Sequence, residues 1–218
     1  MSAVERAPKQ WCVAIEGWPF IGVALPVLLV GLLFNWPIVT AVTLAFVIFS
    51  LFFFRNPDRK IEAAEGAILS PADGKVISIE EVVEPHFLNI PMRKVSIFMS
   101  VANAHVNRAP LTGVVKKMAY YPGKFFCASF DKASLSNERH AVLLDTAAGE
   151  IVFIQIAGLI ARRIVSYLKE GDTIRIGERY GLIRFGSRLD LYLPLKSDIK
   201  VAIGQKVKAG LDTIGFIS

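Results

Sequence analysis

The chain has 218 residues, of which 53% are hydrophobic, and a formal net charge of +6. This length accommodates one ordinary domain with an appendage but not two full-sized catalytic domains, and the apolar fraction excludes a disordered chain. Two cysteines, Cys12 and Cys127, cannot form a disulfide framework and lack the paired spacing of a zinc site, so no metal is expected. Lys and Arg are scattered rather than interleaved with aromatic residues, which favours anionic membrane lipids over nucleic acid as partners.

Residues 17–54 contain no Asp, Glu, Lys or Arg, and the triplet Asn35-Trp36-Pro37 divides them into two apolar runs. Each run is close to the roughly 20 residues that cross a bilayer core as a helix. We therefore predict a membrane helical hairpin at 17–54 after an N-terminal segment, 1–16. Whether the hairpin spans the bilayer or re-enters it stays open, although Pro26 favours the shallower course.

Basic residues flank the hairpin on both sides, with Arg6 and Lys9 before it and Arg55, Arg59 and Lys60 after it. The positive-inside rule then places the rest of the chain on the cytoplasmic side of the inner membrane. The candidates for contact with anionic lipids are Arg55, Arg59, Lys60, Arg93, Lys94, Lys116, Lys117, Arg162 and Arg163. A cleaved signal peptide is the alternative, but the apolar stretch is too long for one and has no small-residue cleavage site.

The remaining residues, 55–218, have the composition of a β-rich domain. Short β-branched and aromatic runs recur between Gly and Pro residues, at Ala67 to Leu69, Lys75 to Ile79, Val95 to Ser100, Gly113 to Tyr120, Ala141 to Asp145 and Ile151 to Ala157. Two later segments share the glycine spacing of hairpin turns. We expect an α+β fold that is mostly β, a compact β-barrel or sandwich behind the helical hairpin. The segment from Gly158 to Glu170 fits a helix or a strand, and that choice stays open.

Four motifs follow one another along this domain. They are Leu69 to Val76 (LSPADGKV), Asn103 to Pro110 (NAHVNRAP), Ser136 to Arg139 (SNER) and Arg184 to Ser187 (RFGS). The ordered set resembles the phosphatidylserine decarboxylase family, in particular its short form with a membrane hairpin. The resemblance covers nearly the whole chain.

The resemblance implies a precursor that cuts itself between Gly186 and Ser187. The Ser187 hydroxyl would attack the Gly186 carbonyl, and glycine on the acyl side leaves room for that attack. The products would be chains of 186 and 32 residues that stay associated. The shorter chain would carry a pyruvoyl group made from Ser187, so that no external cofactor is needed.

A pyruvoyl ketone forms a Schiff base with a primary amine and acts as an electron sink for decarboxylation. The resemblance therefore implies conversion of phosphatidylserine to phosphatidylethanolamine and carbon dioxide in phospholipid biosynthesis. The acyl chains of the lipid and the oligomeric state, including a homo-oligomer, stay open.

The resemblance also assigns roles to three further residues. Asp73, in the turn motif Pro71 to Gly74, matches the aspartate of a Ser-His-Asp relay for self-cleavage. His105 matches a histidine that assists the substrate chemistry. Arg108 occupies the position of the relay histidine in larger members; an always-charged guanidinium cannot act as a base, so we expect Arg108 to bind phosphate or carboxylate and His105 to cover both roles.

Other interpretations of the same residues remain. A membrane-tethered serine hydrolase would use Ser187, His105 and Asp73, but the chain lacks a Gly-x-Ser-x-Gly elbow there. A non-catalytic β-barrel carrier would explain the glycine turns and leave the Gly-Ser pair without a role. His86 is expected at the membrane rather than in catalysis, and His140 is the second candidate for the active site.

Overall fold

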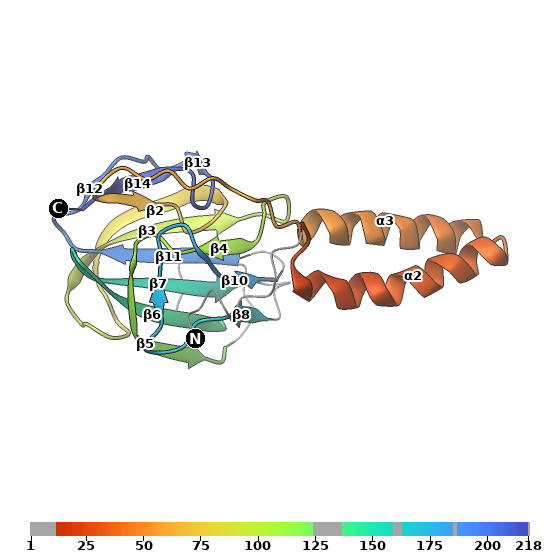
Figure 1. Ribbon diagram of the computed structural model, residues 1–218, viewed down its shortest axis with the longest axis horizontal. Coiled ribbons are helices and arrows are strands. Elements are labelled where there is room, and N and C mark those ends of the chain that lie inside the picture. The colour runs from red at the N-terminus through yellow and green to blue at the C-terminus, as the bar shows by residue number, and fades with distance from the viewer. Residues whose placement is uncertain (1–11, 124–136, 159–162, 185–186, 218) are drawn as a thin grey trace. The chain divides into compact units, whose positions relative to one another are not determined.

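The computed structural model describes residues 12–123, 137–158, 163–184 and 187–217. It divides into two compact units, one ending at Asp58 and the other beginning at Arg59. The first unit contains the apolar helices and the second contains the strands (Figure 1). Each unit is described separately below.

The first unit is a helical hairpin, as the apolar composition predicts. A short 3-10 helix, η1 (Ile15–Gly17), leads into α2 (Trp18–Leu33), and α3 (Pro37–Phe53) follows the turn. Pro37 at the start of α3 suits a helix beginning, where the missing N–H would have no partner. In the turn, Asn35 adopts a left-handed φ of 50°, which asparagine tolerates better than most residues.

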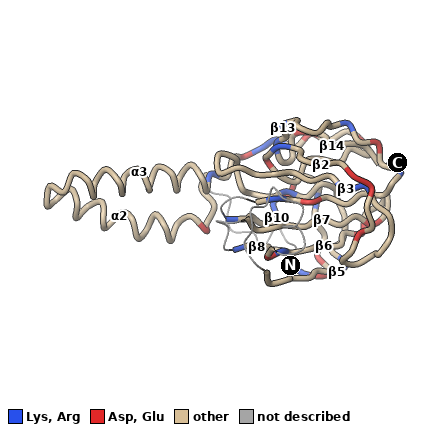
Figure 2. Tube along the Cα trace, turned by 180° about the vertical axis from the view of Figure 1, so that it is seen from behind, with Lys and Arg blue, Asp and Glu red and all other residues tan. Residues whose placement is uncertain are grey.

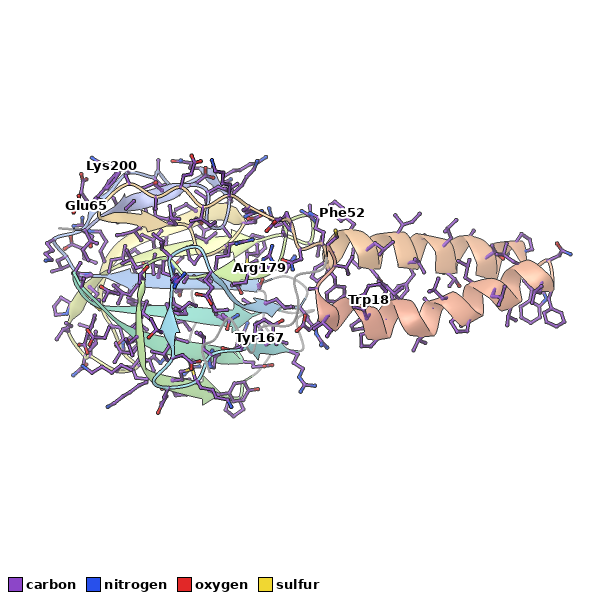
Figure 3. All side chains as sticks on the ribbon, in the orientation of Figure 1. Trp18, Phe52, Glu65, Tyr167, Arg179 and Lys200 are labelled. Atoms are coloured by element: carbon purple, nitrogen blue, oxygen red, sulfur yellow. The ribbon has the colours of Figure 1, made fainter. Side chains whose placement is uncertain are left out.

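The two helices approach closely near the turn and expose apolar side chains elsewhere. A Cβ built on Gly31 would lie 2.8 Å from Thr40 Oγ1, so glycine is what permits this approach. Large apolar side chains such as Val23, Leu33 and Ile38 point outward with more than two thirds of their surface exposed, and sticks of this kind line both helices in Figure 3. Charged residues are absent between the ends of the hairpin (Figure 2).

This surface suits lipid better than water, because a continuous apolar patch of this extent is unfavourable in a soluble protein. The helical stretch from Ile15 to Leu33, 19 residues long, is long and apolar enough to cross a membrane, whereas α3 is shorter. The hairpin can therefore anchor the chain to a membrane.

The second unit is built from antiparallel strands in three sheets. The largest contains, in spatial order, β13 (Lys206–Val207), β2 (Gly74–Val83), β3 (Pro91–Met99), β11 (Ser187–Leu193), β7 (Gly149–Ala157), β6 (Arg139–Thr146), β5 (Gly113–Tyr121) and β9 (Thr173–Ile174). Two small sheets have the orders β1 (Ala67–Leu69), β14 (Thr213–Phe216), β12 (Asp198–Ile199) and β4 (Val106–Arg108), β10 (Arg179–Ile183), β8 (Ile164–Ser166).

The large sheet is buried on two faces. Its inner face, which carries Met99, Val142, Phe153 and Leu189, packs against the residues of the small sheets in the main hydrophobic core. Its outer face carries a second, smaller cluster that includes Tyr192. Since successive side chains of a strand point to opposite faces, a central strand such as β11 must supply buried residues at every position, and it does.

The predicted fold class is confirmed: the chain is mostly β, with an apolar helical hairpin at its N-terminal end. The six predicted strand segments fall within β1, β2, β3, β5, β6 and β7, except that Ser100 lies just beyond β3. The segment left open between helix and strand contains β8, a short strand paired with β10. Residues 159–162 of that segment lie outside the described part of the chain.

Removing the hairpin tests its role as an anchor. A variant lacking residues 1–54 is expected to leave the membrane fraction more completely than the full chain does in high salt, because salt screens charges but does not weaken apolar burial. The measurement is the share of protein that sediments with membranes. Release of the full chain by salt alone would contradict a membrane-embedded hairpin.

Candidate functional site

Ser187 is the first residue of β11 and lies between the last residues of two neighbouring strands. It pairs with Met99 at the end of β3 and with Ala157 at the end of β7. The side chain is fully buried, and its hydroxyl donates a hydrogen bond to Met99 Sδ at 3.3 Å. Gly186, the other residue of the predicted cleavage site, lies outside the described part of the chain.

Asp73 lies at the same end of the sheet, on the other side of β3. It ends the turn before β2, and Gly74 pairs there so closely with β3 that an added Cβ would lie 2.2 Å from the Phe98 carbonyl oxygen. Glycine is therefore required at this position, since any side chain would collide with the backbone. This close approach places the Asp73 turn beside Met99, which contacts Ser187.

The Asp73 carboxylate forms a clamp with two distant segments. Arg59 binds it in a bidentate ion pair, with Nη1 2.6 Å from Oδ1 and Nη2 2.8 Å from Oδ2. The Ala209 N–H donates to Oδ1 at 2.8 Å, and Arg59 Nη1 also donates to the Ala209 carbonyl at 2.6 Å. Both charged side chains are about nine-tenths buried, so the pair is protected from water.

His105 lies one residue before β4, and its ring is fixed by a main-chain group. Its Nδ1 is 2.9 Å from the Asn103 carbonyl oxygen. Because a carbonyl only accepts hydrogen bonds, Nδ1 carries the proton, and Nε2 is then the basic atom of the neutral ring. The His105 carbonyl accepts from the Ile183 N–H at 3.3 Å, so the residue lies beside the strand that leads toward Ser187.

Asp73 and Ser187 thus both lie next to Met99, and the main chain of His105 bonds to the end of β10, the strand before β11. Within the described residues, Asp73 bonds to Arg59 and Ala209, and the His105 ring bonds to the Asn103 carbonyl. Sequence reasoning named Arg59 as one of the candidates for contact with lipid, but its side chain is buried against Asp73.

Arg108 has a structural contact at the other face of β4. Its Nη1 donates to the Gly177 carbonyl at 2.8 Å, and the residue is buried. A Cβ on Gly210 would lie 2.9 Å from Arg108 Cδ, so the arginine stem packs directly on that turn. This placement explains the burial; the predicted contact with phosphate or carboxylate stays a prediction.

The SNER motif supports the end of β7. Asn137 Nδ2 donates to the Ala157 carbonyl at 2.8 Å, and the Ala157 N–H donates to the Glu138 carbonyl at 2.9 Å. The Arg139 guanidinium lies over the Tyr121 ring, 4.4 Å from its centroid. The motif therefore fixes the strand end that pairs with Ser187.

The other two histidines differ in surroundings. Burial lowers the pKa of His86, with the Glu84 carboxylate opposing it, and the ring lies 5.2 Å from that of Tyr121. Burial also lowers the pKa of His140, which pairs across the sheet with Gln155 on β7. Sequence reasoning did not identify Gln155, and it gave no role to its hydrogen-bond partner Asn107 inside the NAHVNRAP motif, because an amide inside a strand carries no spacing signal.

The candidate site therefore consists of a buried serine that begins a central strand, a carboxylate clamped beside the neighbouring strand and an imidazole next to the strand before the serine. A family model described as phosphatidylserine decarboxylase matches residues 46–215. The chain is 48% identical to the phosphatidylserine decarboxylase proenzyme of Syntrophotalea carbinolica over 94% of this chain and 96% of that protein. It is 50% identical to the proenzyme of Citrifermentans bemidjiense over 94% and 96%, and 44% identical to that of Magnetococcus marinus over 95% and 96%. The chain belongs to the phosphatidylserine decarboxylase family.

The Arg59 clamp predicts a large effect on stability. Arg59→Ala leaves the Asp73 carboxylate buried without its cation, and removing one partner of a buried ion pair typically costs about 3 kcal/mol. The matched control is Lys60→Ala, the next residue, whose ion pair with Glu62 is mostly exposed and contributes less than about 0.5 kcal/mol. Thermal and denaturant unfolding of both variants measure the difference. Equal losses in the two would contradict the clamp.

Proposed function

We propose that this protein decarboxylates phosphatidylserine to phosphatidylethanolamine after cutting itself between Gly186 and Ser187. The observation that carries the proposal is the placement of Ser187, buried at the first position of β11 in a chain that belongs to the phosphatidylserine decarboxylase family. Its relatives are named as proenzymes, which supports a precursor that is processed. Family membership favours this function over a serine hydrolase or a carrier.

The pairing of β11 explains how two chains would stay together after the cut. Residues 187–193 pair with β3 on one side and with β7 on the other, and all of them are buried. The Ala209 contacts with Arg59 and Asp73 add a second link across the cut, because Ala209 would belong to the short chain. Cleavage before Ser187 therefore breaks one peptide bond and leaves these contacts in place.

His105 is the base that we assign to self-cleavage. Its Nδ1 is held by the Asn103 carbonyl, so Nε2 is the atom able to take the Ser187 proton. The orienting role that an aspartate has in a relay is filled here by a main-chain oxygen. We also propose that Asp73 takes part in self-cleavage, from a position beside β3 where its carboxylate is paired with Arg59.

The surroundings of Ser187 fit a pyruvoyl group made from this serine. Among the described residues, the Ser187 hydroxyl contacts the Met99 thioether, and Ser187 pairs with Met99 and Ala157 on the neighbouring strands. These groups are uncharged, so a small neutral ketone fits among them. When present, the group supplies a ketone that condenses with a primary amine and a neighbouring carbonyl that accepts electrons as carbon dioxide leaves. The chain's own contribution is to exclude water, since Ser187 is fully buried.

The hairpin supports a lipid as substrate and the cytoplasmic face of the inner membrane as the place of reaction. A chain anchored by apolar helices meets its substrate in two dimensions, and exposed cations on the flanks favour an anionic leaflet. Arg59 does not contribute to that attraction, because it is buried.

Self-cleavage is tested by intact mass measurement of the purified full chain. The expected result is one chain ending at Gly186 and a 32-residue chain that begins with a pyruvoyl group in place of Ser187, while Ser187→Ala stays uncut. The processed protein is then expected to release carbon dioxide from phosphatidylserine and to form phosphatidylethanolamine without added pyridoxal phosphate. A fully active but uncut wild-type chain would contradict the proposal.

Asp73 and His105 are separated by comparing processing with turnover. Asp73→Asn keeps the shape of the side chain but removes the charge that pairs with the buried Arg59 guanidinium, so it is expected to slow self-cleavage at least tenfold and also to lower the free energy of unfolding. His105→Ala is expected to slow cutting. Those molecules that are cut are expected to decarboxylate the lipid more slowly than the cut wild type. The measurements are the rate of conversion to two chains on a denaturing gel and carbon dioxide release per cut chain. Rapid, complete processing of Asp73→Asn would show that its carboxylate serves only the clamp.

A further inference from the structure

The side chain of Asn107 lies beside the reactive serine. Asn107 on β4 and Gln155 on β7 are both fully buried, and Gln155 Nε2 donates to Asn107 Oδ1 at 2.9 Å. The Asn107 amino group donates to Met99 Sδ at 3.7 Å. The same sulfur atom accepts the Ser187 hydroxyl at 3.3 Å. One thioether therefore connects the amide of Asn107 with the nucleophile of the proposed self-cleavage.

The direction of the Asn107 amide is fixed by its neighbours. His140 lies opposite Gln155 in the pairing of β6 with β7, and a side-chain hydrogen bond between them raises the pKa of His140 against the effect of burial. A bond that favours the protonated ring is one that a ring N–H donates, so Gln155 Oε1 is its acceptor. Gln155 then offers its NH2 group to Asn107, which accepts it with Oδ1. The Asn107 NH2 group is thereby turned toward Met99 and Ser187.

The amino group of Asn107 keeps hydrogen-bonding capacity in this position. It carries two N–H bonds, and among the described residues its acceptor is a thioether, which accepts only weakly. Apolar side chains such as Val142 and Leu189 belong to the same buried core. In such surroundings an N–H bond interacts more strongly with a developing negative charge than it does in water. The amide is therefore a preorganised donor beside the reacting serine.

We infer that Asn107 Nδ2 stabilises the negative charge that forms on the attacked carbonyl oxygen during self-cleavage. This role rests on the proposed function and makes Asn107 a further catalytic residue of its first step. In that step Ser187 Oγ bonds to the carbonyl carbon, the π electrons of the carbonyl move to its oxygen, and the hydroxyl proton passes to His105 Nε2. The C–N bond then breaks and the proton moves to the Ser187 nitrogen, which leaves an ester.

Covalent geometry keeps the charged oxygen close to this donor. The attacked carbon is bonded to the Ser187 nitrogen and, after the attack, also to Ser187 Oγ. Its oxygen is therefore next to the atom that contacts Met99, and the Asn107 amino group contacts the same sulfur atom. Side-chain amides suit such a role because they need no reorganisation when the charge appears. Gln155 and His140 act through Asn107 and are positioning residues.

The donor is tested in the full chain, made by cell-free translation in the presence of phospholipid vesicles. Conversion to two chains is followed over time on a denaturing gel at about pH 8, where carboxyl groups are normally ionised. Asn107→Asp keeps the size of the side chain and an acceptor for Gln155, but it loses the N–H donor. This variant is expected to cut about 100-fold more slowly than the wild type.

Gln155→Glu separates the catalytic role from a purely structural one. A carboxylate accepts from both His140 and Asn107, so a hydrogen bond is kept on each side. The Asn107 amide must then rotate to supply its NH2 group, and it presents Oδ1 instead of Nδ2 to Ser187. Gln155→Glu is therefore expected to cut as slowly as Asn107→Asp. A purely structural role predicts cutting at the wild-type rate, because no hydrogen bond is lost.

Val142→Ala is the matched control, because it removes buried volume from the same face of the sheet without changing an amide. It is expected to lower the thermal midpoint and to cut at the wild-type rate. Thermal unfolding is compared in the Ser187→Ala background, in which all chains stay uncut. If one of the two polar variants shows no cooperative transition, the other decides.

Cutting at the wild-type rate by a folded Asn107→Asp or Gln155→Glu variant would overturn the inference, and so would an equal slowing by Val142→Ala. Loss of the cooperative transition in both polar variants would assign the amide pair to the fold and overturn it as well. A wild type that stays uncut would instead overturn the proposed function.

Discussion

The pairing of β11 between β3 and β7 is the interaction on which the rest of the site depends. It sets Ser187 beside Met99 and Ala157, the last residues of the two flanking strands. β11 is hydrogen-bonded to a neighbouring strand at each edge, and all of its residues are buried, so side chains pack against both of its faces. A cut immediately before β11 breaks none of these contacts. The short chain can therefore stay bound after processing.

The clamp at Asp73 shows how stability and chemistry share residues in a small domain. Arg59 and Ala209 are 150 positions apart, yet both bond to one carboxylate beside the reactive strand end. Removing a charge from water is costly unless a well-formed partner offsets it, and the bidentate geometry meets that condition. A substitution at Asp73 therefore acts on the fold and on the site together, which is why a shape-preserving amide is more informative there than alanine.

The sequence predicted those features that depend on local composition. A charge-free stretch with a turn in its middle gives a helical hairpin, and β-branched runs between glycines give strands, since both signals lie within a few neighbouring residues. The Arg59–Asp73 contact and the Gln155–Asn107 pair lie beyond such reasoning. Periodicity tells which face a residue occupies, whereas the partner on that face depends on strand order and register over the whole domain.

The two faces of β11 keep opposite chemistry apart. Arg188 on the outer face forms a fully buried ion pair with Asp190 at 2.6 Å and donates to Ser96 at 2.9 Å, while Ser187 on the inner face meets a neutral thioether. Alternation along the strand places the guanidinium on the opposite face from the neutral surroundings that an unprotonated amine requires. A slip of one residue in the pairing would turn Arg188 toward the inner face and Ser187 away from it. The register of this strand, enforced by charged partners on one face and apolar packing on the other, is therefore itself a determinant of the chemistry.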